Sequence, residues 1–339
     1  MTWQRFIRYL ELVFTAVLIS QTGLLKAQSP EISLREFASG QIKKGVRSIG
    51  MGGDGASWGN YSLIWRDSAT ALIDAGITHY TNGNNFSFTA VGATTPSLWH
   101  RLTIYAIALS QYASNIKTTL KSPGLGPSPV PVHGNGNNQA VFVKAALPFG
   151  KGFSAGILLS YERSQFNATP DAGPQQFVSY HTNWRPSGGF GLSWQPNKLF
   201  LFGFRALLNH DEEVRTDNKG TAEGLVLSHE YRLGGSAVLW KGALLDIGGN
   251  VRYRYNGISN SSQTNIEPNI GFEQSLFNRL LTLRAGVDET SPTVGITLRS
   301  KKIWMDVAYI YNMASVRLAG LFGTTSNSII ATLVFSFSK

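Results

Sequence analysis

The chain has 339 residues, of which 42% are hydrophobic and only 15% are charged, and its formal net charge is +10. Its Lys and Arg residues are spread singly along the chain, which argues against nucleic-acid binding, because such proteins gather basic residues into a patch or stripe. The sequence contains no cysteine, which excludes disulfides, thiolate metal sites and cysteine nucleophiles.

Residues 1–27 are predicted to be a signal peptide. Arg5 and Arg8 precede the apolar run LVFTAVLISQTGLL, and cleavage is expected after Ala27. After the first thirty residues, no segment approaches the run of about 18 uncharged apolar residues that a membrane helix needs. The mature chain is therefore expected to leave the cytoplasm and to contact any membrane without helices.

Residues 28–71 are predicted to form a plug. They show no regular alternation, and the stretch RSIGMGGDGASWGN places Gly50, Gly52 and Gly55 in a literal G-x-G-x-x-G. A dinucleotide site is excluded, because that fingerprint must follow a buried strand and open a helix, and neither flanks this stretch. Glycines also let an irregular chain pack closely and adopt positive φ. We therefore expect this segment to fill the lumen of a barrel.

Residues 72–339 are dominated by alternation of apolar and polar residues with period two. Phe153, Ile157 and Tyr161, for example, alternate with polar residues such as Ser160 and Glu162. Alternation over eight or more residues indicates strands with one apolar face. The predicted strands lie near residues 72–80, 86–95, 101–113, 138–148, 153–164, 187–195, 198–208, 229–240, 243–255, 264–275, 280–288, 292–299, 302–312 and 327–338.

A membrane barrel is favoured over a soluble sandwich. The predicted strands run about nine to eleven residues, the length that crosses a bilayer at a tilt, whereas sandwich strands are shorter. Tight turns such as LPFGKG alternate with long polar loops at residues 115–139, 167–187, 209–224 and 312–326. We therefore predict an all-β fold, a transmembrane antiparallel β-barrel of about 14 strands, with about 12 as the alternative.

The stretch GVRSIGMGGDGAS, residues 45–57, resembles the N-terminal hatch signature of the long-chain fatty-acid transporter superfamily of outer-membrane barrels. That superfamily includes the shuttle barrel of the type IX secretion system of Bacteroidetes, and its signal peptides often end in Ala-Gln, as at Ala27-Gln28. This chain has WRDSATALID where members commonly carry an Asn-Pro-Ala segment. The resemblance implies a plugged barrel in the outer membrane of a Gram-negative bacterium. The hatch residues would be Gly45, Arg47, Gly50, Met51, Gly52, Gly53 and Gly55.

Inward-facing positions of the predicted strands supply the candidate functional residues. Leu199, Leu201 and Leu207 make one strand apolar on its inner face, which predicts either a luminal pocket or a contact with the plug. Inward charges predict either an anion-selective pore or, as we favour, pairs with inward carboxylates and the plug. The candidate luminal charges are Glu162, Arg205, Asp246, Arg252, Arg254, Arg284, Asp288, Arg299 and Asp306.

No catalytic pattern stands out in the sequence. The six histidines occur singly, so a metal site would require spatial convergence, and His181, His210 and His229 are expected near external loops. Ser228 and His229 are adjacent and would lie on opposite faces of a strand, which is poor geometry for a hydrolase. We predict no enzyme activity and no catalytic residue, cofactor or metal.

The leading hypothesis is therefore a monomeric barrel, surrounded by outer-membrane lipid, that binds or passes hydrophobic small molecules. One alternative is a protein-binding component of the type IX secretion system. The other is a structural or anion-selective barrel.

Overall fold

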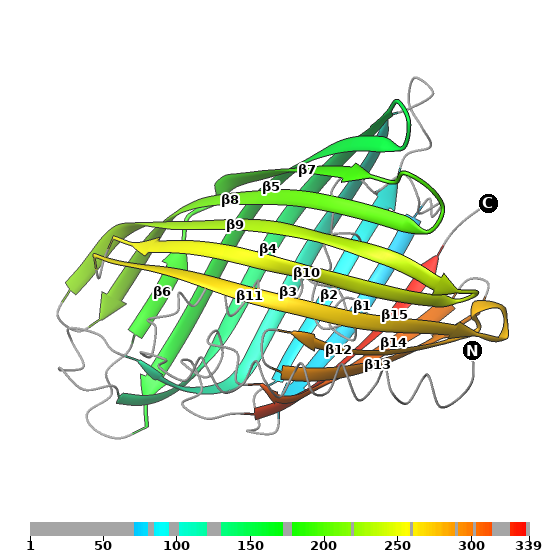
Figure 1. Cartoon of the computed structure of the whole chain (residues 1–339). Helices are drawn as coiled ribbons and strands as arrows, with labels where there is room; N and C mark the ends of the chain where they lie inside the picture. The colour runs from blue at the N-terminus through cyan, green and yellow to red at the C-terminus, as the bar shows by residue number, and fades with distance from the viewer. Residues whose placement is uncertain are drawn as a thin grey trace.

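The computed structural model describes ten ranges of the chain. Most residues of these ranges lie in one antiparallel sheet that curls into a barrel (Figure 1). The predicted signal peptide and all the hatch residues lie outside the described residues. Within the described ranges, no helix is both long and apolar enough to span a bilayer. The ranges are 71–80, 85–94, 102–120, 130–171, 178–217, 220–257, 260–288, 291–300, 303–313 and 326–336.

The strands follow one another around the barrel in chain order, apart from β6 and β7. Their bounds are β1 (Ala71–Tyr80), β2 (Asn85–Thr94), β3 (Thr103–Leu120), β4 (Val130–Phe149), β5 (Phe153–Pro170), β6 (Val178–Thr182), β7 (Arg185–Trp194), β8 (Phe200–Asp217), β9 (Gly220–Trp240), β10 (Ala243–Asn256), β11 (Ser261–Leu276), β12 (Leu281–Asp288), β13 (Ser291–Arg299), β14 (Ile303–Met313) and β15 (Ser326–Ser336), with a 3-10 turn, η3 (Phe277–Arg279), between β11 and β12.

The first and last strands close the barrel. β1 pairs with β15 from Leu72 opposite Ser336 to Tyr80 opposite Ser328. β6 and β7 each pair with both β5 and β8, so they share one position in the wall. The described residues form fifteen strand segments. Because β6 and β7 together occupy one place, these segments fill fourteen places in the ring. The predicted all-β antiparallel barrel is confirmed.

Several strands are about twice as long as predicted. β4 has 20 residues and β9 has 21, and β8 and β9 stay paired up to Asp217 opposite Gly220. The predicted loop at residues 209–224 was therefore wrong, and most of 115–139 is also strand. The alternation of apolar and polar residues stops where the strand leaves the lipid, because neither face of the strand then contacts an apolar environment. The backbone pairing continues beyond this point into water.

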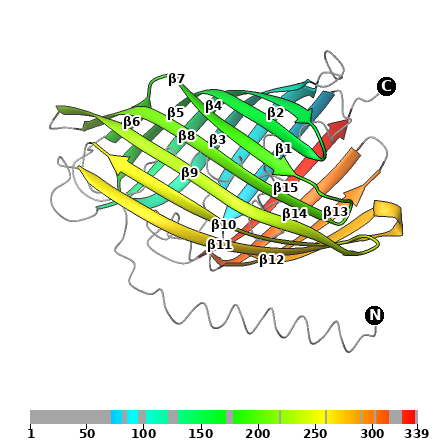
Figure 2. The same cartoon turned by 45° about the horizontal axis from the view of Figure 1, so that its top comes forward.

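The lengthened strands raise one side of the barrel. β12 and β13 have only 8 and 9 residues, whereas β11 has 16. Figure 2 shows β9 to β11 running well past the ends of β12 to β14 at the end opposite the tight turns. We call this taller part of the wall, formed by β3–β5 and β8–β11, the raised rim.

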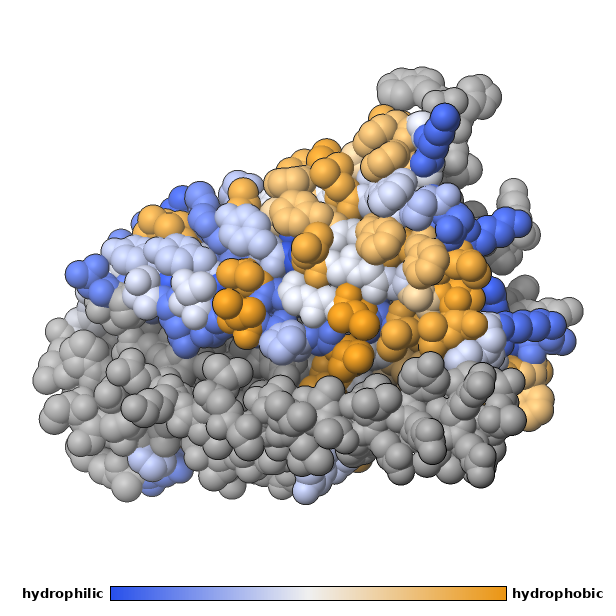
Figure 3. All heavy atoms as spheres, viewed as in Figure 1, coloured by the Kyte–Doolittle hydropathy of each residue, from blue (hydrophilic) through white to orange (hydrophobic). Residues whose placement is uncertain are grey.

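The outer surface of the barrel carries an apolar belt. On β5, outward Ile157, Leu159 and Tyr161 are exposed, whereas the intervening Ser160 and Glu162 are buried toward the lumen. Figure 3 shows apolar residues gathered on β7 to β10 near the tight turns and polar residues toward the raised rim. A closed barrel whose exposed face is apolar satisfies its backbone internally and is suited to lipid. The belt therefore places the wall in a membrane.

Leu159→Arg should weaken folding into lipid, because this outward side chain is 60% exposed within the apolar belt. We expect a loss between about 1 and 4 kcal/mol, because Arg costs about 2–4 kcal/mol at the bilayer centre and less toward the interface, and Leu159 lies between the two. Denaturant titration in phosphatidylcholine vesicles, read by the gel mobility of the folded barrel, measures it. Gln165→Arg is the control, since Gln165 faces outward on the same strand beyond the belt. Equal losses in both variants would contradict the assigned belt.

Candidate functional site

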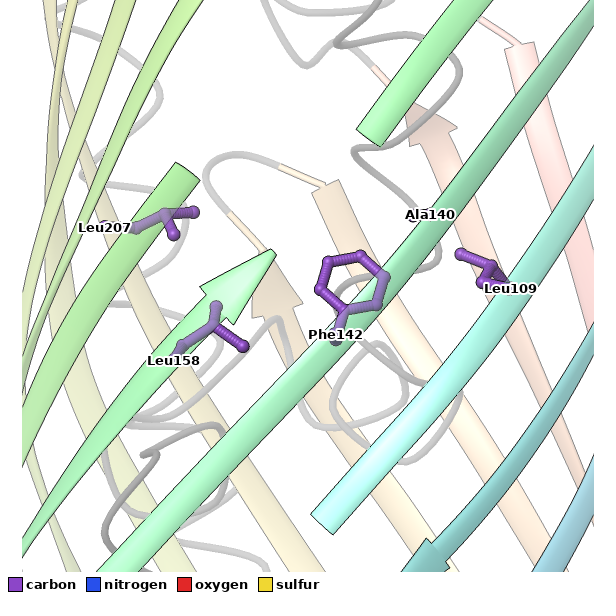
Figure 4. Close-up of a cluster of buried hydrophobic side chains, with 5 residues drawn as sticks. All are labelled: Leu109, Ala140, Phe142, Leu158 and Leu207. Carbon is purple, nitrogen blue, oxygen red and sulfur yellow. The ribbon is translucent and has the colours of Figure 1, made fainter. Parts of the chain in front are cut away.

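Five buried apolar side chains form a cluster on the lumen side of the barrel, which we call the apolar wall. Each is 8% exposed or less, and they come from four strands, β3, β4, β5 and β8. Figure 4 shows them spread in a row across these strands. A barrel lumen is ordinarily polar, so this patch is unusual. The apolar wall consists of Leu109, Ala140, Phe142, Leu158 and Leu207.

The strand register brings these residues together. Leu109 on β3 lies directly opposite Ala140 on β4. Gly189 on β7 lies opposite Leu158 on one side and opposite Leu207 on the other. Because Gly189 has no side chain, the two leucines can approach each other across β7. A larger residue at this position would separate them.

Buried charges occupy the wall next to the apolar cluster. Glu230 on β9 accepts hydrogen bonds from Arg205 Nη2 at 2.9 Å, Arg232 Nε at 2.6 Å and Arg252 Nη2 at 3.1 Å. Arg252 Nη1 also donates to Glu267 Oε1 at 2.7 Å. All five side chains are nearly inaccessible. We call these residues the Glu230 cluster, which ties together four strands, β8 to β11.

A second ionic group continues the charged surface toward the C-terminus. Arg284 on β12 donates from Nε to Glu273 on β11 at 2.8 Å and from Nη1 to Asp306 on β14 at 3.4 Å. Thr297 on β13 also donates to Asp306. With the Glu230 cluster, these contacts span seven strands, β8 to β14. We call this stretch the ionic wall.

The apolar and ionic walls meet at the β8–β9 pair. Leu207 lies directly opposite Glu230 in the register, and Arg205 precedes Leu207 by two residues on the same face. A solute in contact with Leu207 would therefore lie within a few ångströms of the Glu230 cluster. The lumen thus has one apolar side and one ionic side, each built from neighbouring strands.

Most of the inward residues named from the sequence are buried on the lumen side. Leu201 and Leu207 are buried, but Leu199 is 52% exposed because it lies in the turn before β8 begins. Arg299 shares a strand face with buried Thr293 and Thr297 and is exposed at the last position of β13. Arg254 is half-buried, and Asp288 ends β12. The candidate charges that are buried in the structure are Glu162, Arg205, Asp246, Arg252, Arg284 and Asp306.

The sequence prediction missed Arg232 and the carboxylates that pair with the buried arginines. Glu230, Glu267 and Glu273 lie within predicted strands, but each is a single charge whose partner belongs to another strand. The alternation of faces along each predicted strand could have assigned these three glutamates to the inner face. The pairing itself depends on strand register. In the part of the chain that the structure describes, no group of three or more His, Asp and Glu residues could hold a metal ion.

Comparisons with known proteins bear on the fold. No family model and no curated protein matches the chain. The Pseudomonas putida toluene transporter TodX matches with a TM-score of 0.57 at 10% identity, over 86% of this chain and 97% of that one. The CymD monoaromatic hydrocarbon channel matches with a TM-score of 0.57 at 12% identity, over 87% and 98%.

A third solved structure agrees with these two. A Pseudomonas aeruginosa FadL homologue matches with a TM-score of 0.55 at 11% identity, over 86% of this chain and 96% of that one. The fold is that of a FadL-like barrel. At these identities the likeness concerns fold, and at that level it confirms the resemblance seen in the sequence. With the apolar belt, this fold places the protein in the outer membrane of a Gram-negative bacterium.

Glu230→Gln should destabilise the barrel, because it leaves three buried guanidinium groups around a neutral side chain. Breaking a buried ion pair on one side costs about 3–5 kcal/mol. Denaturant unfolding in detergent micelles measures this loss. Glu223→Gln is the matched control, since Glu223 is an exposed carboxylate on the same strand. If both variants unfold at the same denaturant concentration, the Glu230 cluster does not stabilise the wall.

Proposed function

We propose that this barrel binds hydrophobic small molecules and passes them across the outer membrane. The observation that carries the proposal is the apolar wall, five buried apolar side chains on the inner side of the barrel. An apolar solute in contact with this wall gains about 25 cal/mol for each Å² of apolar surface removed from water. Apolar contacts are individually weak and do not require one orientation of the solute. A solute held only by such contacts can dissociate from the wall again.

The structural relatives support the same class of solute. TodX is described as a toluene transporter and CymD as a monoaromatic hydrocarbon channel. Both are barrels of this fold whose solutes are small and apolar. The Leu, Phe and Ala side chains of the apolar wall offer such a solute no hydrogen bonds, and they distinguish it by size and hydrophobicity. Ala71 already belongs to β1, so we propose that residues 28–70, including Arg47, fill the lumen and control release of the solute.

We propose that the ionic wall has a structural role and does not select anions. Arg252 contacts both Glu230 and Glu267, and Arg284 contacts both Glu273 and Asp306. An arginine that is bound by two carboxylates contributes little net positive field to a pore. These pairs link neighbouring strands and would hold one half of the barrel rigid. An anion-selective pore would instead need arginines that face an open lumen.

A protein-binding role in type IX secretion is the second candidate, and the raised rim favours it. On β4, His133, Asn135 and Asn137 face outward and are exposed beyond the apolar belt. Such a polar wall outside the membrane offers a surface to a protein client. Shortening residues 121–129 to a two-residue Asn-Gly turn, a deletion that lets paired Leu120 and Val130 stay joined, should abolish capture of secreted proteins under this hypothesis. Uptake of an apolar solute should be unaffected by the deletion, so the two roles are separable.

Phe142→Asn should reduce uptake of an apolar probe such as toluene by cells that express the barrel. Placing an unpaired amide among apolar groups costs roughly 1–3 kcal/mol, so we expect about a tenfold lower rate. The measurement is initial uptake of labelled toluene, normalised to folded barrel on a gel.

The matched control for this experiment is Thr293→Asn, an inward buried position on β13. It introduces the same amide far around the ring from the apolar wall, so uptake should stay near the wild-type rate. Equal losses in both variants, or no loss in either, would contradict the assigned route. Mass spectrometry of the purified barrel, which should find an apolar molecule in wild type and less in Phe142→Asn, provides an independent readout.

A further inference from the structure

Two histidines meet on the outer surface of the barrel, away from the lumen. His210 on β8 and His229 on β9 lie 19 residues apart in sequence, and their Nε2 atoms lie 3.2 Å apart. The ring centroids are 5.3 Å apart, and the ring planes differ by 26°. The two rings therefore approach each other through their Nε2 atoms.

The strand register creates this arrangement. His229 lies opposite Leu208, and His210 lies opposite Leu227, so the two histidines are diagonal neighbours on one face of the β8–β9 pair. Diagonal neighbours on paired strands are within reach of each other's longer side chains. Both strands are long and continuously paired at this level. The backbone therefore holds the two imidazoles in place before any ligand binds.

The separation of the two nitrogens matches the spacing of two ligands on one metal ion. Zinc binds histidine nitrogen at about 2.0–2.1 Å with tetrahedral angles, which puts two such nitrogens about 3.3 Å apart. Imidazole suits zinc, copper and nickel, whereas magnesium and calcium prefer oxygen ligands. We propose that His210 and His229 form a two-histidine site for a divalent transition-metal ion, with water completing the coordination.

The surroundings of the pair fit such a site. Leu208 and Tyr231 are exposed on the same face within the apolar belt, and the Tyr253 ring lies 6.1 Å from the His229 ring. Toward the raised rim, the next outward residue on β8 is Glu212, which forms an ion pair with Arg185. The site thus lies in the rim-side margin of the belt, with outward Leu225 and Leu227 on its rim side and the Tyr253 ring beside one ligand.

The proposed site would join β8 to β9 at the base of the raised rim. An ion held by one histidine from each strand cross-links the hairpin without contacting the lumen. Metal binding is therefore independent of solute passage, and either property can fail without the other. Without a metal, the same two nitrogens form a hydrogen bond with each other, which keeps the rings in position.

Titration of the full-length barrel in detergent, purified without a histidine tag, tests the proposal. Isothermal titration calorimetry should show one Cu²⁺, Ni²⁺ or Zn²⁺ per chain, with Cu²⁺ the tightest and no binding of Mg²⁺. His210→Ala and His229→Ala should each weaken binding at least about tenfold, since even loss of a residue behind a metal ligand commonly costs that much. His181→Ala is the control, because His181 lies on β6 outside the pair, and binding should be unchanged.

Electron paramagnetic resonance of the Cu²⁺-loaded barrel gives a readout that a purely structural role would not change. The wild-type spectrum should show coupling to two imidazole nitrogens, and each single variant should show one. Gel mobility confirms that every variant remains a folded barrel. Absence of stoichiometric binding, or binding that survives both alanine substitutions, would show that the two histidines form only a hydrogen-bonded pair and would overturn the proposal.

Discussion

The structure depends on one constraint, the need to satisfy every backbone N–H and C=O group without water inside a bilayer. A sheet can meet this need only by closing on itself, since any open edge would leave unpaired groups in lipid. The pairing of β1 with β15 makes that closure. Once the ring is closed, each strand has one face toward lipid and one toward the lumen, and the alternation of side chains follows.

Closure also explains how so many charges can be buried in a protein with a low charged fraction. An unpaired charge away from water is costly, whereas charges that are paired and hydrogen-bonded can be tolerated. The Glu230 cluster and the contacts of Arg284 meet this condition, because each arginine is bound by at least one buried carboxylate on its own strand or on a strand nearby. The apolar wall lacks such pairs. We propose that an apolar solute would gain free energy by contacting this apolar part of the inner surface.

The raised rim also depends on backbone hydrogen bonding between neighbouring strands, here outside the lipid. Pairing of β8 with β9 continues to Asp217 and Gly220, because the hydrogen bonds of a hairpin do not require an apolar face. Beyond the belt the side chains are free to be polar on both faces. The wall therefore changes from a lipid-facing surface to a water-facing surface along single continuous strands, and the two histidines lie at that transition.

The sequence by itself determined the class of fold and the face of many residues. Ile157 and Leu159 could be assigned to lipid and Glu162 to the lumen, because lipid on one side imposes a period of two along each strand. Only the tertiary structure decided which residues meet across strands: Leu158 with Leu207, Glu230 with three arginines, and His210 with His229. The physical reason is that alternation within a strand records its faces, whereas contacts between strands depend on register, which turn lengths and backbone pairing set.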